Sequence, residues 1–336
     1  MEKPKRRSNK LRIILVYICY FALTLNIFLA IANIVVNTDY YLSKVLLPLP
    51  VDDTPPTIQL RGPEHVTIAV GSTYVDEGVT AYDIRSETTV ETNGSVDTTA
   101  IGEYKIEYVA TDEHDNSSTA SRTVSVVQPT GVIYLTFDDG PGAYTSYLLD
   151  VLKKYNVLAT FFVTGSGDDA LIKREYDEGH TVALHSYSHN YSYIYSSVDN
   201  FYADLFAIRD RVKNITGQTS NLMRFPGGSS NTVSTRYDGK SHIMSYLTQD
   251  VGKQGFYYFD WNVNSGDAGG ATTSDEVYDR VVNGLKVGED SVVLQHDIKD
   301  FSVDAVERII QYGLNNGFIF SKLSATSYPA HHGVNN

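Results

Sequence analysis

After Pro129 the sequence predicts an α/β domain whose parallel strands are closed into a barrel or wrapped as a sheet. Short apolar runs alternate there with amphipathic helical segments. Each strand and helix unit is about 25 to 40 residues long, as expected for parallel strands joined by crossover helices. Reactive side chains recur where the runs end, and such folds carry their chemistry at the strand C-termini. Upstream, the sequence predicts a small all-β sandwich preceded by a transmembrane helix.

Length and composition fit a globular protein with room for two domains. The 336 residues are 42% hydrophobic and 20% charged, with a net charge of -13. Residues 1–12 hold six basic residues and one acidic residue, which leaves 21 basic against 39 acidic residues in the remainder. Such an acidic body argues against nucleic acid as a partner. Cys19 is the only cysteine, so no disulfide can form within the chain and a metal must be held by histidine and carboxylate.

The N-terminal stretch from Ile13 to Val36 contains no charged residue and is long enough to span a bilayer. The basic residues before it predict a cytoplasmic N-terminus and an exported remainder, that is, a single-pass protein of the cell membrane whose domains after the helix are extracellular. Ala30-Ile31-Ala32 has the form of a signal peptidase site, so a cleavable signal peptide is the alternative. An uncleaved anchor is favoured because the apolar stretch continues beyond that site. The expected segments are 1–12 cytoplasmic, 13–36 transmembrane and 37–56 linker.

Residues 57–128 alternate apolar and polar side chains in short runs, as strands of an antiparallel sandwich do. Tyr104 to Ala110 shows the alternation most plainly, and turns such as Asn93-Gly94 separate the runs. With Thr123 to Val127, this pattern resembles bacterial immunoglobulin-like surface modules. The module is expected to hold the next domain away from the membrane or to touch cell-wall polymer.

The expected elements of the α/β domain follow from the apolar periodicity. Strands are predicted at 132–137, 159–163, 181–184, 222–225, 256–263, 291–296 and 318–320. Helices are predicted at 146–155, 169–177, 198–214, 242–251, 274–286 and 303–314.

Candidate metal ligands stand at two predicted strand tips. Asp138 and Asp139 end the first strand, where Gly140-Pro141 forces a turn. Alone, this pair would be a solvated turn. His185 and His189 follow another strand at spacing i and i+4, which one helical turn would bring to the same side. Two imidazoles and one carboxylate with an open position form a recurrent catalytic zinc set.

Three more strand tips carry groups suited to catalysis. Arg224 can pair with a carboxylate, Asp260-Trp261 lies towards the end of the long predicted strand at 256–263, and His296 ends the strand at 291–296. The remaining histidines have no such context and are interpreted as structural or exposed: His65, His114, His180, His242, His331 and His332.

Residues 131–325 resemble the polysaccharide deacetylase family, the NodB-homology domain of carbohydrate esterase family 4, and 326–336 form a C-terminal tail. All five family motifs occur in order: Thr136-Phe137-Asp138-Asp139-Gly140, His185-Ser186-Tyr187-Ser188-His189, Arg224-Phe225-Pro226-Gly227-Gly228, Asp260-Trp261 and Leu294-Gln295-His296. The resemblance implies a distorted (β/α) barrel of about seven strands. It also implies that Asp139, His185 and His189 bind one divalent metal ion, zinc first, with cobalt or manganese possible.

The resemblance further assigns the catalytic roles. Asp138 is the general base, with Arg224 as its charge partner. His296 is the general acid, supported by Asp260.

The same family pattern implies the substrate pocket. Trp261 and Leu294 would line the space for the acetyl methyl group, and the Gly227 N–H would stabilise the oxyanion.

The implied activity is metal-dependent hydrolysis of the linear amide bond of N-acetyl groups on an extracellular polysaccharide, first of all N-acetylglucosamine in peptidoglycan. The family pattern leaves several other substrates open: chitin oligomers, poly-N-acetylglucosamine, N-acetylmuramic acid and acetylated xylan. A different class of function is a non-catalytic wall-binding or adhesion protein. The intact ligand set and acid-base pair argue against that alternative.

Overall fold

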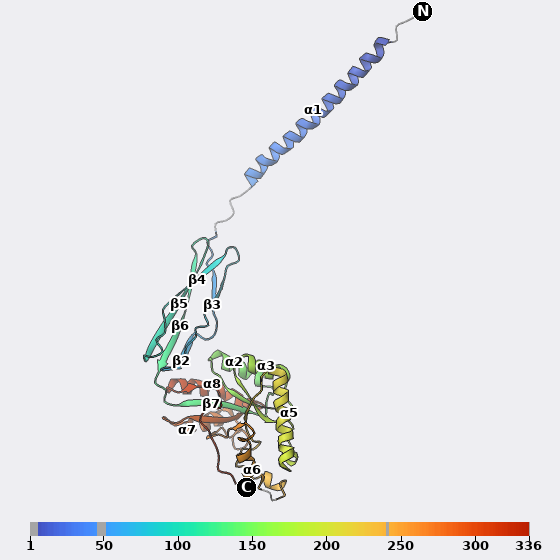
Figure 1. Ribbon diagram of the computed structural model, residues 1–336. Helices are drawn as coiled ribbons and strands as arrows, with labels where there is room; N and C mark the ends of the chain where they lie inside the picture. The colour runs from blue at the N-terminus through green and yellow to red at the C-terminus, as the bar shows by residue number, and fades with distance from the viewer. Residues whose placement is uncertain (1–5, 46–51, 240–241, 336) are drawn as a thin grey trace, which may run out of the picture. The chain divides into compact units, whose positions relative to one another are not determined.

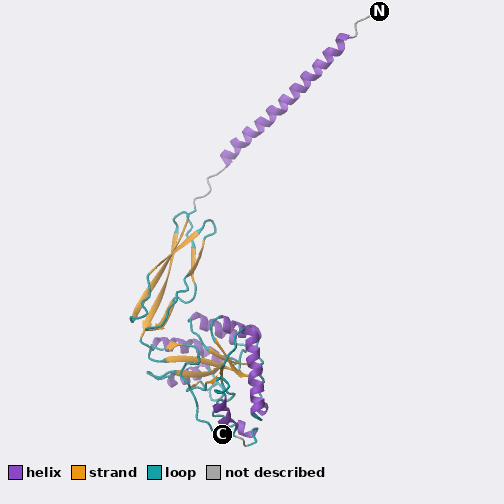
Figure 2. Cartoon of the chain, viewed as in Figure 1, coloured by secondary structure: helices purple, strands orange, loops and turns teal. Residues whose placement is uncertain are grey.

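The computed structural model describes residues 6–45, 52–239 and 242–335 (Figure 1). The chain divides into two compact units, residues 1–54 and 55–336. Helices and strands are distinguished by colour in Figure 2.

The first unit is built on one long helix, α1, from Arg6 to Val45. Its segment Arg12–Thr38 is long and apolar enough to cross a membrane, a property that signal sequences share. The helix continues past Val36 into the segment that the sequence assigns to a linker. The remainder of that linker up to residue 51, and basic residues 3 and 5, lie outside the described residues.

The immunoglobulin-like module contains two sheets. The strands are β1 Thr57–Leu60, β2 His65–Ala69, β3 Val79–Tyr82, β4 Thr88–Asn93, β5 Gly102–Asp112 and β6 Ser117–Val127. One sheet pairs β1 with β3, and the other has the order β2-β6-β5-β4. The pairing of β2 with β6 is parallel, so the expected purely antiparallel sandwich is wrong in this detail.

The α/β domain is built on an eight-stranded sheet of order β11-β10-β9-β8-β7-β13-β12, with β14 also paired to β7. Every pairing in it is parallel. The strands are β7 Val132–Asp138, β8 Thr160–Thr164, β9 Thr181–Ser186, β10 Leu222–Met223, β11 Tyr257–Tyr258, β12 Val263–Asn264, β13 Ser291–His296 and β14 Ile319–Phe320. Four of these have only two residues, and the sheet has one strand more than the expected seven because the segment 256–263 holds two strands, β11 and β12.

Helices connect the strands. They are α2 Thr145–Lys154, α3 Asp169–Asp177, α4 Tyr191–Ile194, α5 Val198–Thr216, α6 Ile243–Asp250, α7 Ser274–Gly284 and α8 Asp300–Asn315, with a 3₁₀ turn η1 at Ser234–Arg236. Local sequence explains their ends: the Ser197 side chain caps α5 at its start, and Gly217 ends it with φ 78°. Thr273 and Glu276 form a capping box at the start of α7.

The strand predicted at 256–263 is wrong as a single element. It consists of β11 and β12, which lie at opposite ends of the sheet order. Between them, Phe259 donates its N–H to Met223 O, and Asn262 donates its N–H to Val292 O. The segment therefore crosses from the β10 side of the sheet to the β13 side, and Asp260 lies in the crossing rather than at a strand tip.

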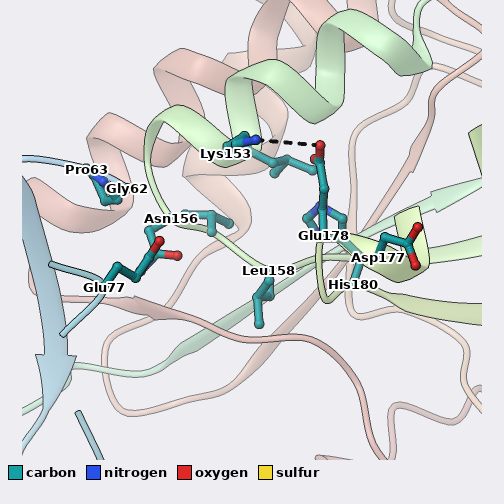
Figure 3. Close-up of a pocket in the computed structure, with 11 residues that line it drawn as sticks. Gly62, Pro63, Glu77, Lys153, Asn156, Leu158, Asp177, Glu178 and His180 are labelled. Atoms are coloured by element: carbon teal, nitrogen blue, oxygen red, sulfur yellow. Dashed lines mark ion pairs between the residues drawn. The ribbon is translucent and has the colours of Figure 1, made fainter. Parts of the chain in front are cut away.

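A cavity of about 270 Å³ lies among α2, α3 and the residues Gly62, Pro63 and Glu77 (Figure 3). An ion pair of 4.0 Å joins Lys153 and Glu178 at its edge. None of the residues predicted to be catalytic or metal-binding lines this cavity.

Candidate active site

The Asp138-Asp139 pair lies where β7 ends and the chain turns. Asp139 has φ 72°, and the Gly140-Pro141 peptide that follows is cis. A left-handed backbone at a non-glycine residue is uncommon and is found preferentially at functional sites. The turn lets the two neighbouring carboxylates serve one site, since on a regular strand they would face opposite sides.

The three predicted metal ligands converge. One ligand atom each of Asp139, His185 and His189 lies within 4.8 Å of the other two. Asp139 Oδ1 is 3.4 Å from His185 Nε2 and 3.2 Å from His189 Nε2. Two ligands of a tetrahedral zinc ion, each about 2.0 to 2.1 Å from the metal, lie roughly 3.3 Å apart. The spacing of this triad therefore fits a small divalent ion.

The electrostatics of the triad agree with that fit. Asp139 Oδ1 is buried and accepts no hydrogen bond among the described residues, which is costly unless another partner satisfies it. Burial opposes ionisation of Asp139, but the surrounding histidines, His185 first, hold the pKa of that carboxyl well below its usual range. Asp139 is therefore in the charged form that a metal ligand requires.

His185 is oriented by the backbone. Its Nδ1 lies 3.0 Å from the carbonyl oxygen of Arg224, and because a carbonyl only accepts, Nδ1 carries the proton. Nε2, which faces Asp139, is then free to bind a metal. This arrangement of one ring nitrogen on a backbone carbonyl and the other on the metal is common in metal sites.

The expected helical turn between His185 and His189 is wrong. His185 lies within β9, and His189 follows a turn in which its own φ is 48°. Asp204 of α5 holds this turn: its carboxylate accepts the hydroxyl of Ser186 at 2.5 Å and the backbone N–H of Tyr187 at 2.7 Å. Convergence of the two imidazoles thus depends on a buried carboxylate from helix α5.

Asp204 lies outside the five motifs, so the motif pattern does not single it out. A signal is nevertheless present in the sequence, since Asp204 falls on the apolar face of α5 between Phe201 and Ile208. A buried carboxylate on such a face needs partners, and the turn after β9 supplies them.

Asp138 and Arg224 form a buried pair next to the triad. Arg224 Nη1 donates to Asp138 Oδ1 at 2.7 Å and to Thr136 Oγ1 at 2.8 Å. The remaining nitrogens donate to backbone carbonyls, Nε to Phe259 O and Nη2 to Asp260 O, both at 2.9 Å. Arg224 is fully buried, so its charge is directed at Asp138 in a site with little solvent screening.

His296 lies beside Asp138 because β7 and β13 are paired in that register. Its Nδ1 contacts Asp267 Oδ1 at 2.8 Å, and its backbone N–H donates to Asp267 Oδ2 at 2.7 Å. Burial lowers the pKa of His296, but Asp267 and the charges of Asp138 and Asp139 overcome this and raise the pKa to about 9. Nε2 points towards the triad, 3.9 Å from Asp139 Oδ2.

The partner of His296 is therefore Asp267, and the expectation that Asp260 supports His296 is wrong. Asp260 lies in the crossing segment, where its carboxylate accepts the N–H of Ser229 at 2.8 Å. Asp267 follows β12 and so lies at a strand tip. The strand-tip rule would have found it had the break between β11 and β12 been foreseen.

The residues predicted for the substrate pocket lie around the same centre. Leu294 is buried on β13, two residues before His296. Trp261 is half-buried, and its ring fills the space beside Gly228. A side chain at position 228 would not fit, because its Cβ would lie 3.0 Å from Trp261 Cη2. Gly227 has φ 79°, and its N–H donates no hydrogen bond among the described residues.

Tyr191 lies against Gly227. A Cβ at Gly227 would lie 3.1 Å from the Tyr191 hydroxyl, and the Tyr191 ring packs edge-on against His189 with centroids 5.4 Å apart. Burial and the charges of Asp139 and Asp138 raise the pKa of Tyr191 to about 12, so this hydroxyl is neutral.

Two family models match the chain. Residues 58–126 match the bacterial surface protein Ig-like domain, and residues 125–247 match polysaccharide deacetylase. A peptidoglycan-N-acetylglucosamine deacetylase of Bacillus cereus is 33% identical over 209 residues, which cover 59% of this chain and 71% of the relative.

Two solved structures of deacetylases are also similar to this chain. The catalytic domain of a peptidoglycan N-acetylglucosamine deacetylase from Eubacterium rectale is 51% identical, with a TM-score of 0.59 over 61% of this chain and 94% of that domain. A polysaccharide deacetylase from Bacillus cereus is 30% identical, with a TM-score of 0.52 over 60% of this chain and 96% of that structure.

Proposed function

Because the chain belongs to the polysaccharide deacetylase family, we propose that it hydrolyses the N-acetyl groups of an extracellular polysaccharide, with N-acetylglucosamine of peptidoglycan as the substrate. The observation that carries the proposal is the meeting of three groups at one edge of the sheet. These are the Asp139 triad, the Asp138–Arg224 pair and the His296–Asp267 pair. The 51% identity to the Eubacterium rectale catalytic domain supports the substrate.

A divalent metal held by Asp139, His185 and His189 would supply Lewis acidity, which acidifies water and polarises a carbonyl group. The donor set of two imidazoles and one carboxylate suits zinc first, with cobalt or manganese as possible replacements.

Asp138 is placed to take the proton from the attacking water. Arg224 keeps the charge of this carboxylate paired, and its four hydrogen bonds hold the guanidinium in one orientation. Two different roles for adjacent aspartates follow, because Asp139 contacts the histidines while Asp138 contacts Arg224.

His296 is placed to protonate the departing amine, which is a poor leaving group without that proton. Asp267 holds the Nδ1 proton and leaves Nε2 directed at the triad. A raised pKa keeps His296 protonated at neutral pH, as a general acid requires.

The acetyl group would lie between the Gly227 N–H and the apolar side chains. The N–H is available to a developing oxyanion, and Trp261 and Leu294 offer an apolar surface to the methyl group. A methyl pocket favours N-acetyl over bulkier acyl groups.

The helix α1 would anchor the enzyme to the cell membrane, with the basic residues at its start on the cytoplasmic side. Protease added to intact cells should then degrade the catalytic domain, and the mature protein should keep its N-terminus. Detection of a species cut after Ala32 would replace the anchor by a cleaved signal peptide.

Acetate release tests the activity. Full-length protein in detergent is expected to release acetate from purified peptidoglycan, to lose this activity with a chelator and to regain it with zinc. Chitin oligomers, poly-N-acetylglucosamine and acetylated xylan in the same assay rank the substrates. His185→Ala is the matched inactive control, and absence of chelator-sensitive release from every acetylated glycan would refute the proposal.

A further inference from the structure

The last residues of the chain are packed against the candidate active site. We propose that the C-terminal segment 330–335, chiefly through His332, holds the loop carrying Gly227 and the indole of Trp261 in the positions that deacetylation needs. The proposal rests on the proposed function for its catalytic consequence. It makes His332 a positioning residue, since no contact joins it to the metal triad among the described residues.

The imidazole of His332 bridges two segments. Its Nε2 lies 2.7 Å from the carbonyl oxygen of Trp261, and its Nδ1 lies 3.0 Å from Ser230 Oγ. A carbonyl only accepts, so Nε2 carries the proton, and Nδ1 can accept the Ser230 hydroxyl. One ring therefore ties the loop after Arg224 to the segment of Trp261.

Asp260 extends the bridge into the core. Its carboxylate accepts the backbone N–H of His332 at 2.9 Å and the N–H of Ser229 at 2.8 Å, while its backbone oxygen accepts from Arg224 Nη2. Asp260 is fully buried. The tail, the loop and the guanidinium that pairs with Asp138 are thus joined through one residue.

The residues on either side of His332 also bind to the α/β domain. Ala330 O accepts the N–H of Asp260 at 2.7 Å, and Asn335 Nδ2 donates to Ser230 O at 2.7 Å. His331 stacks on Tyr258 with ring centroids 3.9 Å apart and contacts the Tyr258 carbonyl oxygen at 2.9 Å. A segment with this many partners is part of the domain rather than a loose tail.

The catalytic consequence follows from what the bridge holds. The His332 ring meets the Trp261 ring edge-on at 4.7 Å, and Trp261 fills the space beside Gly228. Removal of the imidazole breaks the contacts to the Ser230 hydroxyl and to the Trp261 carbonyl together. The metal ligands, which lie directly after β7, on β9 and in the turn after β9, keep their own supports.

The test compares His332→Ala with His331→Ala, a matched control that removes the adjacent imidazole without touching the loop. His332→Ala is expected to lower kcat/KM for acetate release about tenfold, since small misplacements of binding groups have effects of this order. Metal content and thermal unfolding should stay as in the wild type. His331→Ala should stay within about twofold, and His332→Gln, which can still donate to Trp261 O, should recover part of the loss.

A second readout does not depend on activity. Trp261 is the only tryptophan, so its emission maximum and its quenching by acrylamide report the bridge directly. His332→Ala should alter both, and His331→Ala should alter them less. Unchanged Trp261 fluorescence, or unchanged kcat/KM with an active wild type, would overturn the proposal. Absence of acetate release by the wild type would instead overturn the proposed function and leave the bridge to be judged by fluorescence.

Discussion

The two domains of the second unit each bury an arginine against an aspartate, and the two pairs differ in what else the aspartate contacts. In the immunoglobulin-like module, Arg122 is 1% exposed and pairs with Asp76. In the α/β domain, Arg224 is fully buried and pairs with Asp138. Burying such a charge is unfavourable unless partners satisfy it, so both pairs need an explanation.

The pair in the immunoglobulin-like module is saturated. Asp76 accepts hydrogen bonds from the hydroxyls of Tyr74 and Tyr108 in addition to Arg122, and Arg122 also donates to the carbonyl oxygen of Pro63. Both carboxylate oxygens of Asp76 thus accept hydrogen bonds from within the module, which is how a structural cluster is built.

The pair in the α/β domain is incomplete. Among the described residues, only Arg224 donates a hydrogen bond to Asp138, and the neighbouring Asp139 Oδ1 is buried without a donor. Three histidines face these carboxylates. In this protein, unfilled hydrogen-bond acceptors, rather than burial of the ion pair itself, distinguish the reactive pair from the structural one.

Asp138→Asn would break the reactive pair with the largest expected effect. The asparagine can still accept from Arg224 but cannot take a proton, so kcat for acetate release should fall about 10³-fold. Metal content should be unchanged, whereas His185→Ala should lose both metal and turnover. Near-normal turnover by Asp138→Asn would exclude it as the base.

Asp267→Asn would test the second charged pair of the site. Without the carboxylate, His296 is held less firmly and its proton is less stabilised, so kcat should fall about 10²-fold at unchanged metal content. Ser302→Ala removes only a hydroxyl that donates to Asp267 and should have a smaller effect. Equal losses from the two variants would mean that packing rather than charge is responsible.

Acid should act on the two domains differently, because the α/β domain buries a neutral histidine. Burial, with Lys322 and Arg174, lowers the pKa of His180 to about 4. In the unfolded chain this histidine takes up a proton near pH 6.5, whereas in the folded domain it does so only near pH 4. The free energy of unfolding is therefore highest above pH 6.5 and falls as the pH drops towards 4. At about pH 5 it is lower by about 2 kcal/mol.

His180→Asn should remove this acid sensitivity. Urea unfolding of chelated protein, followed by Trp261 fluorescence at about pH 7.5 and about pH 5, measures it. The same pH dependence in both proteins would assign the acid sensitivity to other groups.

Asp76→Asn would weaken the saturated cluster of the immunoglobulin-like module, and we expect it to have the smallest effect of these substitutions. Loss of charge-assisted hydrogen bonds at this partly exposed carboxylate should cost about 1.5 kcal/mol of the free energy of unfolding. The urea midpoint measured by circular dichroism should fall. The urea midpoint measured by Trp261 fluorescence and the kcat for acetate release should not change. A fall in kcat would show that the immunoglobulin-like module contributes to the site.

The sequence by itself determined the order of elements and the residues with reactive side chains. Apolar runs and capping residues are local properties, so helices such as Asp169–Asp177 were predicted with their observed bounds. Parallel strands bring their C-terminal tips to one edge, and this rule alone is enough to place Asp139, His185 and His296 together.

Only the tertiary structure decided which side chains support them. Asp267 rather than Asp260 contacts His296, Asp204 orders the turn before His189, and His332 bridges two loops. These contacts join residues from 16 to 102 positions apart in the chain, and no local spacing encodes such distances. They depend on where the chain crosses between β11 and β12 and on how the last residues pack, which are properties of the folded domain.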